Sequence, residues 1–94
     1  MPIIVVASER EDTADEVARR LRREGAVVLA THSMHGCLRV ATSVRPDIVV
    51  LDAHLPPRLE RLLRAHPTSA GARLFHLSPE GIHRFVPTAA SLAY

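Results

Sequence analysis

The feature that most constrains the fold is a succession of three short apolar runs separated by two segments of helical spacing. The runs cover residues 3–7, 26–31 and 48–52, and they are rich in β-branched residues. Continuously apolar runs are typical of strands buried on both faces, as in parallel sheets covered by helices. Alternation of such strands with helices predicts right-handed β-α-β units in a single α/β domain of 94 residues.

The ends of the first two helices carry recognisable signals. Residues 13–16 form a Thr-x-x-Glu capping box, which predicts that the first helix begins at Thr13. Gly25 suits the C-cap of this helix. The second helix is expected over residues 37–44, because the proline at position 46 disfavours its continuation. Ser33, in the preceding polar connection, is a candidate N-cap for this helix.

The rest of the chain has a weaker pattern. A short third helix is expected between Pro57 and Ala65, followed by a fourth strand over residues 73–78. Beyond it, residues 83–86 could form a short fifth strand, and residues 88–94 a helical turn.

Two segments resemble a known family. The sequence PDIVVLDAHLPP at residues 46–57 is similar to the third strand and following loop of response-regulator receiver (CheY-like) domains, and HPTSAGARLFHLS at residues 66–78 is similar to their approach to strand four. The resemblance covers about residues 1–78 and implies a flavodoxin-like, three-layer parallel sheet of strand order 2-1-3-4, truncated after strand four.

The resemblance also implies a chemistry. Receivers accept a phosphoryl group on the aspartate that ends strand three, with a divalent metal and a lysine neutralising the transferring oxygens. Asp52 holds the acceptor position, and Ser78 holds the position of the hydroxyl that reads the product.

The chain departs from this family at the residues that support the acceptor. Ala7 and Ser8 stand where receivers carry an acidic pair, so Glu9 is the residual carboxylate there. Asp52 and Glu9 together make a poor cage for a hard cation, so we expect no cofactor beyond weak magnesium binding. The chain also contains no lysine to take the role of the receiver lysine. Arg84 lies near Ser78 in the sequence, but nothing in the sequence places its side chain in the site.

The C-terminal part of the chain is short for a receiver. We divide the chain into a receiver-like core, residues 1–78, and a tail, residues 79–94, that replaces the usual last strand and helices. A parallel crossover needs a dozen or more residues, so a fifth strand must be antiparallel or swapped into another copy. The sheet side left uncovered predicts an interaction surface and a homodimer. Its candidate residues are Val40, Phe75, Phe85, Val86, Leu92 and Tyr94.

Three other patterns suggest alternatives. Asp52-Ala53-His54 is similar to the D-x-H-x-x-G of cobalamin-binding domains, but Pro57 stands at the glycine position and the pattern follows the third strand. His32, His35 and Cys37 could bind zinc or copper, although no second ligand pair is evident in the sequence. The arginines at residues 19–23 could contact nucleic acid, but a solvated helix face explains them better.

Composition narrows the function. The net charge is +2, aromatic residues make up 3% and there is one cysteine, so nucleic-acid binding and disulfides are not expected. No stretch reaches transmembrane length, and we expect a cytoplasmic protein.

We therefore expect a non-enzymatic, receiver-like signalling module that acts through protein–protein interaction and is not efficiently phosphorylated. The alternatives are a phospho-accepting response regulator that uses Asp52, and a small-ligand or metal-binding domain of the same fold.

Overall fold

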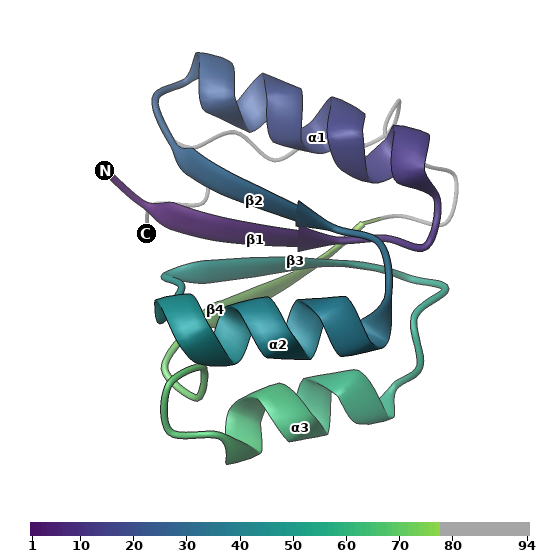
Figure 1. The fold of residues 1–94 in the computed structure, drawn as a ribbon, viewed down its shortest axis with the longest axis vertical. Helices are drawn as coiled ribbons and strands as arrows, with labels where there is room; N and C mark the ends of the chain where they lie inside the picture. The colour runs from purple at the N-terminus through teal and green to yellow at the C-terminus, as the bar shows by residue number, and fades with distance from the viewer. Residues whose placement is uncertain (78–94) are drawn as a thin grey trace.

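A computed structural model describes residues 1–77, which form a four-stranded parallel sheet between two helical layers. The elements in chain order are β1 (Ile3–Ala7), α1 (Glu11–Arg23), β2 (Val27–Thr31), α2 (Met34–Val44), β3 (Ile48–Asp52), α3 (Arg58–Ala65) and β4 (Arg73–Leu77). The strand order is β2-β1-β3-β4. Helix α1 covers one face of the sheet, and α2 and α3 cover the other (Figure 1). The predicted order 2-1-3-4 and the three-layer α/β architecture are confirmed.

The central strands are apolar throughout because each of their faces meets a helical layer. Ile4 and Val6 of β1 pack with α1, whereas Val5 and Ala7 of the same strand pack with α2 and α3. All five residues of β3 are buried, and Ile48 to Leu51 alternate between the two cores in the same way. At about 25 cal/mol per Å² of apolar surface, this double burial is the main stabilising term of so small a domain.

The parallel register brings the carboxyl ends of all four strands to one edge of the sheet. Ala7 lies opposite both Thr31 and Leu51, and Asp52 lies opposite Leu77. The residues that follow these positions therefore meet at the same edge, as expected for ligand sites in open parallel sheets.

Helix α1 begins earlier than the capping box predicted. Its N-cap is Arg10, which makes no side-chain cap hydrogen bond, and Thr13 is buried in the first turn. The Thr13 prediction was wrong because the chain already turns at Ser8, whose Oγ accepts the Arg10 amide at 3.1 Å. The other end lies one residue before the predicted C-cap: Glu24 is the C-cap, and Gly25 follows it with φ +94° and donates its amide to the Arg22 carbonyl at 3.1 Å.

Helix α2 is one turn longer than predicted. Ser33 caps it by accepting the Gly36 amide at 2.9 Å, so the helix begins at Met34 instead of residue 37. It ends at Val44 as predicted, where Arg45 takes the left-handed conformation with φ 52° before Pro46.

Several predictions lie outside the described residues. They concern Ser78, Arg84, the strand at 83–86, the helical turn at 88–94, the boundary between residues 78 and 79, and the surface residues Phe85, Val86, Leu92 and Tyr94. Within residues 1–77, none of the helices has the length and apolar character needed to cross a membrane.

Candidate functional site

Asp52 ends β3 at the carboxyl edge of the sheet, as predicted, and its carboxylate is held on both oxygens. The Ser8 hydroxyl donates to Oδ2 at 2.6 Å, and the His54 amide donates to Oδ1 at 3.1 Å. The side chain is almost enclosed, with 6% exposed. A buried polar group needs hydrogen-bond partners, and Ser8 and His54 supply them, so the protein itself satisfies Asp52.

Ser8 is the residue that links Asp52 to the start of α1. It follows β1 directly, is fully buried, and its amide donates to the Thr31 carbonyl at 3.1 Å. Its Oγ donates to Asp52 while accepting the Arg10 amide, so both capacities of the hydroxyl are used. Sequence reasoning noted Ser8 only as the replacement for a carboxylate. The contact of Ser8 with Asp52 could have been inferred from the predicted strand order, because the parallel strands β1 and β3 end at the same edge of the sheet.

The donor set does not fit the divalent metal that the receiver fold implies. A hard cation needs several oxygen ligands, and Asp52 is the one buried carboxylate among residues 1–77. Glu9 is exposed, and no hydrogen bond or ion pair connects it to Asp52. In this part of the chain, no group of three or more His, Cys, Asp or Glu residues is placed to hold a metal ion.

A pocket of about 360 Å³ opens beside Asp52, between β4 and the beginning of α3. Glu60, Arg61 and His76 line this pocket, and Glu60 makes ion-pair contacts with two neighbouring side chains. The His76 Nε2 atom lies 3.1 Å from Glu60 Oε1, and Arg64 Nε lies 3.6 Å from Glu60 Oε2. The sequence did not predict this cluster, which joins a helix to a strand that follows it.

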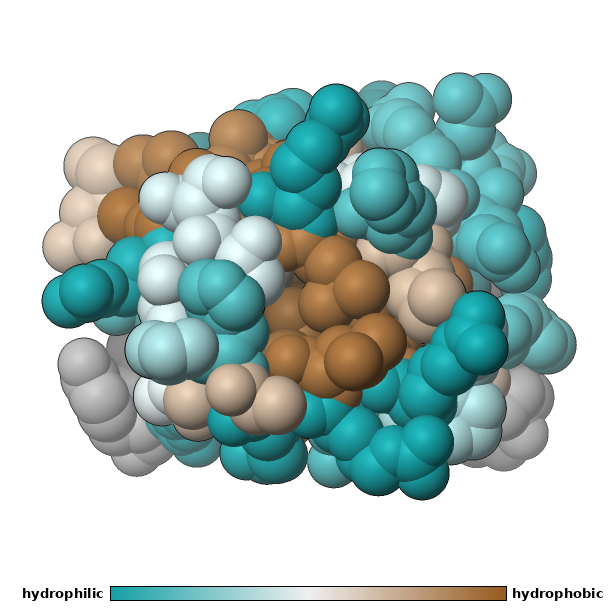
Figure 2. Space-filling model, turned by 60° about the horizontal axis from the view of Figure 1, so that its bottom comes forward, coloured by the Kyte–Doolittle hydropathy of each residue, from teal (hydrophilic) through white to brown (hydrophobic). Residues whose placement is uncertain are grey.

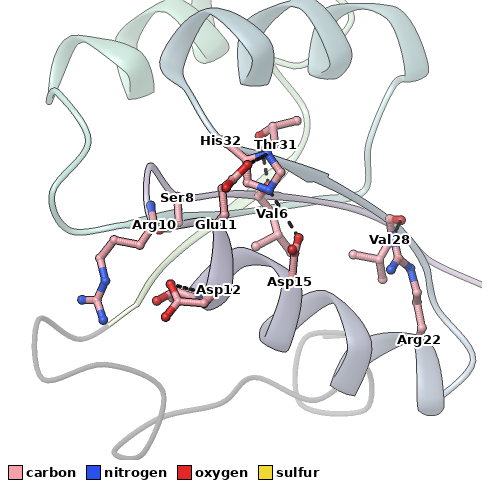
Figure 3. A network of polar contacts seen from close by, with 11 residues as sticks. Val6, Ser8, Arg10, Glu11, Asp12, Asp15, Arg22, Val28, Thr31 and His32 are labelled. Atoms are coloured by element: carbon pink, nitrogen blue, oxygen red, sulfur yellow. Dashed lines mark hydrogen bonds and ion pairs between the residues drawn. The ribbon is translucent and has the colours of Figure 1, made fainter.

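The proposed metal ligands His32, His35 and Cys37 do not come together. His32 points to α1, with Nε2 3.3 Å from Asp15 Oδ1 and Nδ1 4.0 Å from Glu11 Oε1 (Figure 3). His35 is exposed on α2, and Cys37 is fully buried beneath the same helix. The pattern therefore does not form a metal site in the described structure.

Cys37 behaves as a small apolar residue. It packs in the core shared by α2, α3 and the sheet. Burial raises the pKa of the Cys37 thiol to about 11, and a side-chain hydrogen bond with Thr31 offsets part of this increase. Thr31 in turn donates to the Val6 carbonyl at 3.0 Å, which ties β2 to β1 (Figure 3).

The arginine cluster at the end of α1 makes intramolecular contacts. Arg20 pairs with Glu16 at 3.3 Å, and Arg22 donates to the Val28 carbonyl at 2.8 Å. Phe75, one of the two predicted surface residues within the described part, is partly buried against the core on the α1 side. The Arg73 guanidinium lies 5.2 Å from its ring centroid. Val40 packs partly buried against the opposite core.

Comparison with solved structures identifies the fold. The chain is similar to a response regulator from Desulfuromonas acetoxidans, with a TM-score of 0.75, 17% identity, and coverage of 89% of this chain and 72% of the other. It is similar to the chemotaxis response regulator CheY4 of Vibrio cholerae, with a TM-score of 0.75, 18% identity, and coverage of 85% and 73%.

A third similar structure is the N-terminal domain of a response regulator receiver protein from Methanoculleus marisnigri JR1. Its TM-score is 0.74, with 19% identity and coverage of 94% of this chain and 81% of the other. No protein-family model and no curated protein matches the sequence. The geometry and these comparisons together show that residues 1–77 have the fold of a response-regulator receiver domain.

Proposed function

We propose that this chain is a non-catalytic, receiver-like signalling or regulatory module that acts through protein–protein interaction and is not efficiently phosphorylated. The observation that carries the proposal is the 2.6 Å hydrogen bond from Ser8 to Asp52. A neutral hydroxyl occupies the place where receivers hold a metal-binding carboxylate. The acceptor position is thus retained as a structural element without the charges that phosphoryl transfer requires.

Two further features support this proposal. The sequence offers no lysine to neutralise a transferring phosphoryl group. The Asp52 oxygens already accept hydrogen bonds from Ser8 and His54, so a metal ion would have to displace them. Homodimerisation is part of the same proposal, since the residues predicted to mediate it include the partly buried Phe75 on the outermost described strand, β4.

The test is to incubate the protein with acetyl phosphate and Mg²⁺ and to measure intact mass. We expect no acid-labile phosphate adduct under conditions in which an active receiver, treated in parallel, is modified. An adduct that is present in the wild type and absent in Asp52→Ala would overturn the proposal. Sedimentation of the unmodified protein tests the dimer separately.

A phospho-accepting regulator remains the second candidate, and one observation favours it. Asp52 lies at the rim of a pocket that also includes Arg61 and His76, two side chains able to carry positive charge. If the mass assay detects phosphate on Asp52, these two residues are the first candidates for replacing the absent lysine. Arg61→Gln and His76→Gln would then reduce the yield of the adduct.

A further inference from the structure

Helix α3 has an outward side whose composition is not explained by its own packing. Leu59 and Leu63 are fully buried and supply the contacts that hold the helix against the sheet. Leu62, between them in sequence, faces outward with 44% of its surface exposed. Leu62 gains less from folding than Leu59 and Leu63 do, because part of its apolar surface stays in contact with water and remains available for a partner.

The charges around Leu62 are unbalanced. Glu60 is the acidic residue of α3, and it is already engaged by Arg64 and His76. Arg58 and Arg61 are exposed, and neither has an ion-pair or hydrogen-bond partner in the described structure. Arg58 also occupies the first position of α3, where a positive charge opposes the helix dipole. These arginines therefore do not serve the stability of the helix itself.

The neighbouring helix also carries apolar residues that are only partly buried. Helices α2 and α3 lie side by side on the same face of the sheet (Figure 1). Val40 and Val44 of α2 are only partly buried, and Arg39 is exposed on the same helix. Figure 2 views the molecule from the side of α3 and shows apolar residues gathered in the middle of this face, with hydrophilic residues around them.

We propose that the outer face of α3, formed by Arg58, Arg61 and Leu62, docks an acidic amphipathic helix of a separate protein partner. This inference rests on the proposed role as an interaction module and assigns the module a surface. An apolar stripe on the partner helix contacts Leu62, and its flanking carboxylates pair with Arg58 and Arg61. Such a partner supplies both the apolar contact and the negative charge that the face lacks.

Two other occupants fit less well. Nucleic acid would satisfy the arginines, but it would leave Leu62 without an apolar contact, and the chain has few aromatic residues for base stacking. A second copy could offer the acidic beginning of α1, yet the apolar side of that helix is already buried in its own core. A separate acidic helix is the occupant that matches both properties of the face.

The experiment uses the full chain and a fluorescein-labelled peptide of Leu, Glu and Ala with leucines at i, i+3, i+4 and i+7 spacing. Fluorescence anisotropy measures the Kd, and ¹H–¹⁵N spectra locate the contact. We expect saturable binding that weakens as salt is raised. We also expect the largest shifts on α3, and at least a tenfold increase in Kd for Leu62→Ala and for Arg58→Glu combined with Arg61→Glu.

Matched controls separate this site from general electrostatics. Arg19→Glu combined with Arg23→Glu makes the same charge change on α1, and Val27→Ala removes the exposed valine of β2. Both variants should bind the peptide as the wild type does. The proposal is overturned if the α1 variant loses as much affinity as the α3 variant, if the peptide does not bind, or if the shifts lie elsewhere.

Two further measurements test whether nucleic acid or a second copy of the chain binds this face instead. Tighter binding of a labelled DNA duplex through Arg58 and Arg61 would replace the proposal with a nucleic-acid site. A self-association that Leu62→Ala abolishes would replace it with a contact between copies. Neither result depends on phosphorylation of Asp52, so the docking site and the proposed absence of phosphorylation fail independently.

Discussion

The Ser8 hydroxyl donates a 2.6 Å hydrogen bond to Asp52 Oδ2, across 44 residues of sequence and between the ends of two adjacent strands. The pair is buried, so the contact is protected from competing water. A second carboxylate at position 8 would repel Asp52 and would recruit a cation. The hydroxyl does the opposite, because it satisfies Asp52 without added charge.

Replacing Ser8 by aspartate should create a metal dependence that we do not expect of the wild type. Two neighbouring buried carboxylates repel each other, so Ser8→Asp should unfold at a lower temperature than the wild type in the presence of EDTA. Added Mg²⁺ binds the folded state and should raise the Tm of the variant by several degrees. Thermal unfolding with and without Mg²⁺ measures both effects. The control is Ser8→Asn, because asparagine has the size of aspartate without its charge. The Tm of this variant should not change when Mg²⁺ is added. An equal increase of Tm with Mg²⁺ in the wild type would contradict the conclusion that the residues around Asp52 do not fit a divalent metal.

Removing the Asp52 carboxylate should destabilise the fold. Asp52→Ala leaves the buried Ser8 hydroxyl and the His54 amide without an acceptor, which costs about 1–3 kcal/mol. Urea unfolding measures the change, and Glu9→Ala, at an exposed carboxylate of the same edge, should be near neutral. In a site evolved to crowd negative charge, loss of the aspartate would stabilise the protein. A stabilised Asp52→Ala would therefore favour the phospho-accepting alternative.

Arg22 should matter more than the other arginines of its cluster. Its Nη2 donates to the carbonyl of Val28 at 2.8 Å, and β2 is one of the two edge strands of the described sheet (Figure 3). Arg22→Ala should cost about 0.5–1.5 kcal/mol and leave a carbonyl of the sheet edge free to pair with another chain. Urea unfolding and sedimentation velocity measure the two effects. Arg19→Ala removes an exposed arginine of the same helix and is the control. If the two variants behave alike, the contact has no protective role.

The sequence predicted the fold well because the fold depends on local patterns. The burial of β3 on both faces can be predicted from five consecutive residues of its sequence. Gly25 predicts the end of α1, because glycine readily takes the positive φ that this turn requires. The errors came from competition between local signals and tertiary contacts. Thr13 had the right pattern for a cap, but Ser8 had already fixed the start of α1 through Arg10.

The site was only half predictable for a related reason. Asp52 was identified from its place at the end of a strand, a property of one segment. The contacts of Ser8 with Asp52 and of His76 with Glu60 each join two segments, so residue type and spacing alone do not reveal them. The first contact follows only when the order of the parallel strands is also considered. Similarly, His32 and Cys37 are close in sequence, yet one lies against α1 and the other beneath α2. Sequence proximity suggested a shared metal that the described geometry does not form.

Cys37 should make the stability of the protein fall at high pH. Burial raises the pKa of its thiol from 9.0 to about 11, so between these values the thiol is ionised in the unfolded chain and protonated in the folded one. The unfolded state then binds fewer protons, and the free energy of unfolding decreases as the pH rises through this window. Urea unfolding at a series of pH values from 8 to 11 measures this slope. Cys37→Ala removes the group and should flatten the slope relative to the wild type. Below the ordinary pKa of the thiol both proteins should show the same pH dependence, and an unchanged slope in the variant would mean that other groups titrate in this range.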